Sequence, residues 1–245
     1  MHGDAKPFTV VLSCAMTPLP YPLFYSFRRC PYAMRARMAL VASAQVCELR
    51  EVVLAKKPAA LLLTSAKGTV PVLLTPAGQV VDQSLDIMLW ALRRNDPLQW
   101  LGDDHSSLAQ ILQLVKQCDD EFKFHLDRYK YPNRFGISDA TTHRDLATRY
   151  LAELNFRLSE HVYMMGRSEC LADVAIAPFI RQFAHTDPAW FASQPWPALQ
   201  FWLAAFESSS IFEQVMQKFP AWVPGQPTVL FPMPRVALAP GHIRT

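Results

Sequence analysis

The 245-residue chain lacks the patterns that mark membrane, metal-binding and nucleic-acid-binding proteins. No apolar run reaches the roughly 18 residues of a spanning helix. The net charge of +3 is mild, and no block of Lys and Arg and no RNA-binding motif accompanies it. The seven histidines include no i, i+4 pair and no His-Glu-x-x-His motif. We therefore expect a cytoplasmic protein with no metal, no nucleic acid and no membrane partner.

Cysteine usage adds a second exclusion. The five cysteines are an odd number, and they are widely scattered with no metal-ligand spacing. This pattern is typical of a reduced, intracellular protein rather than of a disulfide framework or a zinc site. The apolar fraction of 51% against 18% charged residues favours extensive burial, with some surface covered by a partner subunit.

The most informative motif is Cys30-Pro31-Tyr32-Ala33, which lies between a strand-like and a helix-like segment. Proline suits the first position of a helix, because its missing N–H would have no partner there. Free amides and the positive end of the helix dipole then point at the Cys30 sulfur, and Arg28 and Arg29 add positive charge. Both effects lower a thiol pKa. Ala33 stands where a dithiol oxidoreductase carries its second cysteine, so the resolving thiol must come from outside.

The first half of the chain predicts a small mixed sheet. The first two strands are joined by a helix and should be parallel, whereas the tight turn at residues 76–78 makes the last two antiparallel. The expected order is strand 21–27, helix 34–44, strand 48–54, helix 58–65, strands 70–75 and 79–82, and a helix from Ser84 to Arg94.

Beyond a linker at residues 95–104 the pattern is helical only. The last 23 residues, 223–245, contain five prolines, so we expect an extended tail or wrap there rather than a folded unit. No internal repeat is present. The domains are therefore expected at 21–95, 105–222 and 223–245, and the helices of the second at 106–129, 139–161, 171–184, 197–208 and 211–219.

In this order and spacing, the Cys30 motif, Gly68-Thr69-Val70-Pro71, Asp82-Gln83-Ser84 and an all-helical second half resemble the glutathione transferase superfamily. More narrowly, the chain is similar to its cysteine-type, omega-like bacterial branch. The resemblance covers residues 21 to 219. It implies a thioredoxin-like domain (a mixed four-stranded sheet) followed by an all-helical domain, a homodimer, and glutathione bound as co-substrate on the first domain.

The resemblance also assigns the glutathione-binding residues. A cis peptide bond at Val70-Pro71 would present the Val70 backbone to the cysteinyl unit of glutathione, as an added strand would. Gln83 and Ser84 would hold the γ-glutamyl end, with Gln83 replacing the more usual acid. Lys57 is expected at the glycyl carboxylate, and Lys56 is a rival for that role.

Two segments of the helical half leave alternatives open. Residues 125–131 interleave bases and aromatics, and they either line the cleft or form a polar helix end. Four further side chains either form an aromatic wall or pack in the core: Phe183, His185, Trp190 and Phe191.

Two smaller expectations concern the remaining cysteines. Cys170 and Asp173 occupy a capping-box position, with Asp173 accepting from the backbone N–H of Cys170. Cys14, Cys47 and Cys118 are expected to be small buried groups rather than reactive thiols.

The expected function is a glutathione-dependent thiol transferase that reduces mixed disulfides or glutathionyl adducts through Cys30 alone. Reduction of dehydroascorbate by the same thiol is compatible with this function. One alternative is a non-catalytic interaction protein of the same fold. A lesser alternative is conjugation of glutathione to electrophiles, in which Tyr25 or Ser26 supplies a hydroxyl to the glutathione thiolate.

Overall fold

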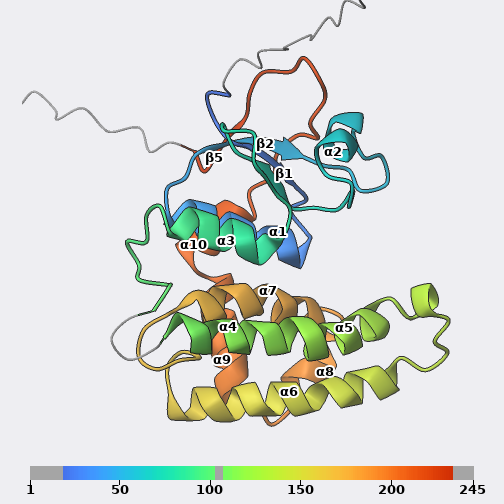
Figure 1. The fold of residues 1–245 in the computed structure, drawn as a ribbon. Helices are drawn as coiled ribbons and strands as arrows, with labels where there is room; N and C mark the ends of the chain where they lie inside the picture. Colours follow the sequence, from blue (N-terminus) through green and yellow to red (C-terminus); the bar gives the residue numbers. More distant parts are fainter. Residues whose placement is uncertain (1–18, 103–106, 234–245) are drawn as a thin grey trace, which may run out of the picture.

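The computed structural model describes residues 19–102 and 107–233. A sheet-containing domain and a helical domain lie one above the other (Figure 1). The sheet has the order β4-β3-β1-β2-β5. Its strands are β1 (Leu23–Ser26), β2 (Cys47–Glu51), β3 (Val72–Leu74), β4 (Val80–Val81) and β5 (Leu230–Phe231).

The sheet domain has the thioredoxin-like arrangement that the sequence predicts. β1 and β2 are parallel, with Leu23 opposite Glu48, and they are joined by α1 (Pro31–Ala42). β3 pairs antiparallel with β1, and β4 pairs antiparallel with β3. α1 and α3 (Ser84–Leu92) cover the face of the sheet that is turned to the helical domain, whereas α2 (Ala59–Thr64) lies away from it (Figure 1).

The fifth strand comes from the end of the chain. Beyond the predicted four strands, β5 pairs antiparallel with β2, so that Cys47 lies opposite Phe231. The Trp222 amide also donates to the Glu51 carbonyl (2.8 Å), and the Leu49 amide donates to the Val229 carbonyl (2.7 Å). This segment satisfies polar groups along the edge of β2 that a bare edge strand would leave unpaired. A two-residue strand carries no periodic signal, so the sequence did not indicate it.

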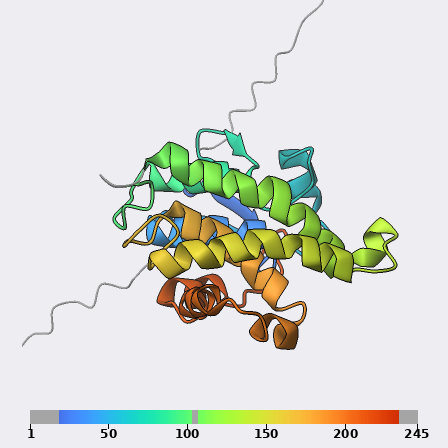
Figure 2. The same cartoon turned by 90° about the horizontal axis from the view of Figure 1, so that it is seen from below.

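The helical domain begins with one long helix that contains a change of pitch. α4 (Leu108–Gln117) continues through a π-helical segment, η1 (Cys118–Phe122), into α5 (Lys123–Lys130). α5 and α6 run side by side below the sheet domain (Figure 2). The remaining elements are η2 (Pro132–Phe135), α6 (Thr141–Glu160), α7 (Leu171–Ala184), α8 (Pro188–Ala192), α9 (Pro197–Glu207) and α10 (Ser210–Val215).

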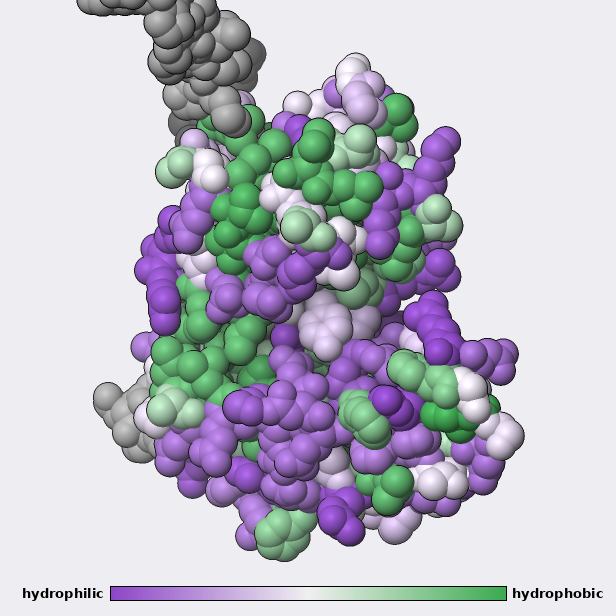
Figure 3. All heavy atoms as spheres, turned by 45° about the vertical axis from the view of Figure 1, so that its right-hand side comes forward, coloured by the Kyte–Doolittle hydropathy of each residue, from purple (hydrophilic) through white to green (hydrophobic). Residues whose placement is uncertain are grey.

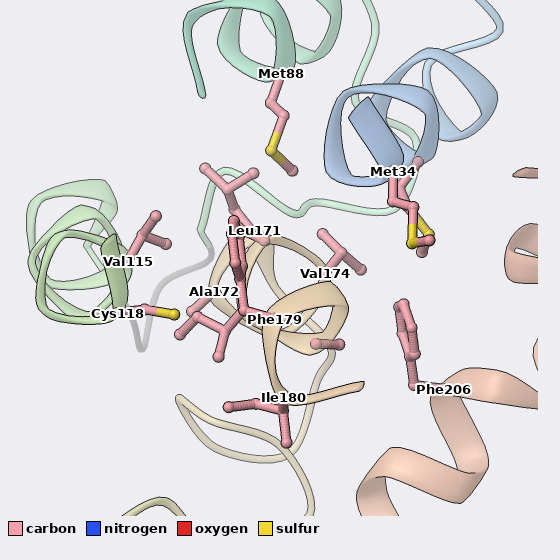
Figure 4. Packing of buried hydrophobic residues seen from close by; sticks show 14 of the residues in the cluster. Met34, Met88, Val115, Cys118, Leu171, Ala172, Val174, Phe179, Ile180 and Phe206 are labelled. Carbon is pink, nitrogen blue, oxygen red and sulfur yellow. The ribbon is translucent and has the colours of Figure 1, made fainter. Parts of the chain in front are cut away.

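One apolar core joins the two domains. The central helix α7 is buried along most of its length and packs against α1 of the sheet domain and α4 of the helical domain. Figure 4 shows Met88 from the sheet domain directed toward Leu171 of α7, and Met34 directed toward Phe206 of the helical domain. The relative placement of the domains is therefore fixed by packing. No helix in residues 19–102 or 107–233 is both long and apolar enough to cross a membrane.

Candidate functional site

Cys30 lies where the sequence predicts, at the N-cap of α1. Its backbone is extended (φ −79°, ψ 122°), its carbonyl accepts from the Met34 amide (2.8 Å), and Pro31 takes the first helical position. The side chain is half-buried. Its sulfur lies 3.7 Å from the carbonyl oxygen of Val70, a suitable distance for a thiol that donates a weak hydrogen bond.

The electrostatics of this thiol differ from the expectation. Burial raises the pKa of Cys30 above its ordinary value, and this effect outweighs the backbone N–H groups of Ala33 and Tyr32, which lower it. The positive charges of Lys123 and Arg35 also lower the pKa, to a smaller extent. The helix N-terminus thus acts on the sulfur as predicted, but desolvation of the thiolate dominates.

The arginines that precede Cys30 do not supply the predicted charge. The Arg28 amide donates to Glu51 Oε1 (2.8 Å), and its guanidinium donates to the Met216 carbonyl (3.3 Å). Arg29 is exposed and lies over the ring of Phe27 (5.3 Å). The cations that act on Cys30 instead come from α1 and α5.

A cleft of about 640 Å³ opens beside Cys30, and we call it the thiol cleft. It brings together all six residues that the sequence proposes for the site: Cys30, Lys57, Val70, Pro71, Gln83 and Ser84. Lys56 does not line the cleft. Sequence reasoning missed several lining residues: Tyr32, Arg35, Lys67, Thr69, Asp82 and Asp119.

The loop before β3 presents backbone groups to the cleft. The Val70–Pro71 peptide bond is cis, as predicted. The Val70 carbonyl faces the Cys30 sulfur, and the Val70 N–H has no acceptor in the described part of the chain. An extended peptide that lies along this loop would find both a donor and an acceptor there.

Ser84 is fixed in place by a buried arginine from α1. Arg35 Nε donates to the Ser84 hydroxyl (2.9 Å), and the two terminal nitrogens of Arg35 donate to the Asp119 carboxylate (2.9 and 2.8 Å). The Arg35 side chain is 3% exposed and that of Asp119 is 25% exposed. Asp119 belongs to η1, so the local π-helical turn coincides with the residue that ties the helical domain to the cleft.

The charges of the thiol cleft suit a ligand with one excess negative charge. Arg35, Lys57 and Lys67 contribute three positive charges, while Asp82 and Asp119 contribute two negative ones. Asp82 is held at the rim, since its carboxylate accepts from the Ser65 hydroxyl (2.7 Å) and its carbonyl accepts from Lys67 Nζ (3.1 Å). Gln83 is exposed at the N-cap of α3.

The hydroxyl groups offered by the conjugation alternative lie outside the cleft. The Tyr25 hydroxyl accepts from Arg50 (2.7 Å), and the Ser26 hydroxyl accepts from Arg37 Nε (2.8 Å). Tyr25 is 1% exposed and Ser26 is fully buried. Neither side chain can approach a thiolate bound beside Cys30, so this role is wrong for both residues.

Residues 125–131 were expected either to line the cleft or to form a polar helix end, and different residues of this segment do each. Lys130 and Tyr131 line an adjacent cleft, whereas His125 faces His143 across α5 and α6, with 2.9 Å between their Nδ1 atoms. Of the two alternatives for Phe183, His185, Trp190 and Phe191, core packing holds for most of them. Phe183 and Phe191 are buried, Trp190 packs edge-on against Phe183, and only His185 lines a cleft with Lys130 and Tyr131.

The other cysteines of the described residues are buried. Burial raises the pKa of Cys47 and of Cys118 to about 12, which makes both inert at neutral pH. At the start of α7, Asp173 accepts from the Cys170 backbone amide (3.0 Å), which confirms that half of the capping box. Cys14 lies outside the described residues. Among residues 19–102 and 107–233 no group of His, Cys, Asp or Glu could hold a metal ion.

Residues 24–99 match the family model for the glutathione S-transferase N-terminal domain. No curated protein matches the chain. Among solved structures, a glutathione transferase family member from Pseudomonas fluorescens Pf-5 with two glutathiones bound has a TM-score of 0.70 at 17% identity, covering 80% of this chain and 92% of that one. A glutathione S-transferase from Methylobacillus flagellatus KT with glutathione bound also scores 0.70, at 19% identity, with coverage of 80% and 100%. FzlA from C. crescentus scores 0.67 at 19% identity, with coverage of 82% and 94%. The chain thus has a glutathione S-transferase fold, and its first domain has the matching sequence pattern.

Proposed function

We propose that this chain is a glutathione-dependent thiol transferase that acts through Cys30, as a cysteine-type, omega-like member of the glutathione transferase superfamily. The observation that carries the proposal is the thiol cleft. It combines one half-buried cysteine at a helix N-terminus, a cis-proline loop with a free amide, and a serine at the start of a second helix.

The chemistry is two successive thiol–disulfide exchanges. The Cys30 thiolate attacks the glutathione sulfur of a mixed disulfide. A Cys30–glutathione disulfide forms, and the other half leaves as a thiolate that takes up a proton. A second glutathione thiolate then attacks the glutathione sulfur of this disulfide, which gives oxidised glutathione and returns the Cys30 thiolate. Ala33 makes the external thiol necessary. Reduction of dehydroascorbate by the same thiol is compatible with this cycle.

The residues that the sequence proposes for the site each have a physical role in this proposal. Val70 pairs with the cysteinyl unit of glutathione, and Pro71 shapes that loop. Ser84, held by Arg35, takes the γ-glutamyl carboxylate, while Gln83 takes the ammonium group without a charge of its own. Lys57 reaches the glycyl carboxylate, and Lys67 is a second cation at the same rim.

The raised pKa of Cys30 shapes the expected kinetics. Little thiolate exists at neutral pH, but the intrinsic nucleophilicity of a thiolate rises with its pKa, with a Brønsted coefficient of about 0.4–0.5. As the pKa of the thiol rises, the thiolate fraction at neutral pH therefore falls faster than the nucleophilicity of the thiolate rises. Turnover should be slow at pH 6 and should increase toward pH 9, as the thiolate fraction grows.

The direct test is glutathione-dependent reduction of hydroxyethyl disulfide by the wild type and by Cys30→Ser. Cys47→Ser, which replaces a buried thiol away from the cleft, is the matched control. We expect turnover in the wild type and the control and none in Cys30→Ser. Undiminished turnover in Cys30→Ser would show that Cys30 is not the nucleophile. Absence of turnover in the wild type would favour the non-catalytic interaction protein.

The proposal extends to the setting of the enzyme. We propose a cytoplasmic homodimer whose partners are glutathione and a small-molecule or protein disulfide. Conjugation to electrophiles is the lesser alternative, because a cysteine beside bound glutathione tends to form a disulfide with it rather than to activate its thiolate. Formation of a stable thioether from 1-chloro-2,4-dinitrobenzene faster than hydroxyethyl disulfide reduction would reverse this order.

A further inference from the structure

A second cleft, of about 930 Å³, lies next to the thiol cleft. Both chain neighbours of Cys30, Arg29 and Pro31, line it, and Leu54 lines both clefts. We call it the basic cleft. Its walls come from both domains: the β1–α1 and β2–α2 loops on one side, and the ends of α5 and α7 on the other. Figure 3 shows hydrophilic side chains on both sides of the indentation between the domains.

The charges of this cleft are unbalanced. Its basic lining residues are Arg28, Arg29, Lys130, Arg134, Arg181 and His185. Among the residues that the structure describes, the only carboxylate that lines it is that of Glu51, which is already paired with the buried Arg37.

Most of these basic residues have no carboxylate partner within residues 19–102 and 107–233. Arg181 and His185 share Glu207 (2.8 Å each), but in the described part of the chain Arg28, Arg29, Lys130 and Arg134 form no ion pair. Burial and the nearby Arg181 lower the pKa of Lys130, as expected for a cation held among cations.

An aromatic surface lies between the unpaired cations. Arg134 stacks over the ring of Tyr131 (4.3 Å), and Lys130 Nζ lies 5.8 Å from the same ring centroid. The Tyr131 hydroxyl accepts from Gln182 (3.4 Å), and its own proton has no acceptor within residues 19–102 and 107–233. Apolar side chains complete the wall, among them Phe27, Met216 and Phe219.

We propose that the basic cleft selects the co-substrate, and that it takes an organic anion with an aromatic or apolar body. This inference rests on the proposed function. In a mixed disulfide, the glutathione half would occupy the thiol cleft, and the anionic half would cross Leu54 into the basic cleft. Cys30 attacks the glutathione sulfur, and the anionic half leaves as a thiolate on the cationic side, which also favours its departure.

The first experiment compares mixed disulfides of glutathione that differ only in charge. The second halves are 4-mercaptobenzoate, the neutral 4-mercaptobenzamide of matched shape, and the cationic 4-(aminomethyl)thiophenol. We expect kcat/KM for the carboxylate to exceed that for the carboxamide by about tenfold, with the amine lowest. The preference should weaken as ionic strength rises. Equal values for the three disulfides would overturn the inference and leave the proposed function intact.

Amino-acid substitutions test whether the preference for the carboxylate arises in the basic cleft. In the double variant Lys130→Gln/Arg134→Gln, the ratio of kcat/KM for the carboxylate to kcat/KM for the carboxamide should fall toward one. Arg128→Gln is the control, since Arg128 lies on α5 with Lys130 but stacks over Phe124 (3.4 Å) and does not line the basic cleft. Loss of selectivity in the control, or its retention in the double variant, would contradict the assignment.

A binding measurement separates this inference from turnover. Calorimetric titration of Cys30→Ser with S-(4-carboxybenzyl)glutathione and S-(4-carbamoylbenzyl)glutathione needs no reaction. Tighter binding of the carboxylate by Cys30→Ser, together with no turnover of any disulfide by the wild type, would support the basic cleft and refute the thiol transferase. Equal binding of both thioethers, or binding of neither, would refute the basic cleft as a selecting site.

Discussion

Replacement of Arg35 by glutamine should both destabilise the protein and loosen the thiol cleft. The guanidinium makes three hydrogen bonds, one to Ser84 (2.9 Å) and two to Asp119 (2.9 and 2.8 Å), and its side chain is 3% exposed. Loss of one member of a buried ion pair costs about 3–5 kcal/mol. Because a quarter of the Asp119 side chain is exposed to solvent, which screens the remaining charge, we expect about 2–3 kcal/mol.

The assay is urea denaturation of the wild type, Arg35→Gln, Arg35→Lys and Lys116→Gln. Arg35→Lys keeps the charge but loses the planar fork, so it should recover only part of the loss. Lys116→Gln removes an exposed pair with Asp120 on the same long helix and should leave the free energy of unfolding unchanged within error. If Arg35→Gln unfolds at the same urea concentration as Lys116→Gln, the reasoning about this interdomain pair is wrong.

Three further predictions follow from other buried groups. Burial raises the pKa of Glu169, whose carboxylate accepts from Trp100 Nε1 (3.1 Å), to about 7 from an ordinary 4.5. A carboxyl with a raised pKa contributes stability that is full below about pH 4.5 and is lost as pH rises through about 7. Urea denaturation should therefore show that the wild type loses about 2–3 kcal/mol of unfolding free energy between pH 5 and pH 8 relative to Glu169→Gln. Parallel pH profiles of the two proteins would contradict this prediction. Alkylation of Cys30 by iodoacetamide, followed by peptide mapping, should accelerate up to and beyond pH 9, whereas a plateau below pH 7 would mean that the helix dipole outweighs burial. Phe231→Ala, at a side chain 1% exposed in β5, should cost about 3–5 kcal/mol in urea denaturation, and a cost near zero would show that β5 does not hold the sheet edge.

Local signals in the sequence were sufficient for the order of the first four strands, for most of the helices and for the position of the thiol. The helix at 171–184 has the predicted bounds, because it is apolar almost throughout and begins at a capping box. The proline at position 31 placed Cys30 at a helix start, and the Val-Pro and Gln-Ser pairs placed two further parts of the cleft. These features depend on a few adjacent residues, which a sequence displays directly.

The features that the sequence did not reveal depend on distant residues. Arg35 and Asp119 are 84 positions apart, and nothing local indicates that they meet or that the helix adopts a π-helical turn there. The pKa of Cys30 was expected to be lowered, because the helix terminus is visible in sequence and the burial that raises the pKa is not. The positive charge of the basic cleft likewise arises from three separate segments of the chain, residues 28–29, 130–134 and 181–185.

The most direct test of the central claim is the intact mass of the protein after incubation with oxidised glutathione. We expect one glutathione adduct, located on Cys30 by peptide mapping, absent in Cys30→Ser and removed by excess reduced glutathione. The buried Cys47, Cys118 and Cys170 should remain unmodified. No adduct, or an adduct that persists in Cys30→Ser, would contradict the assignment of Cys30 as the single redox centre.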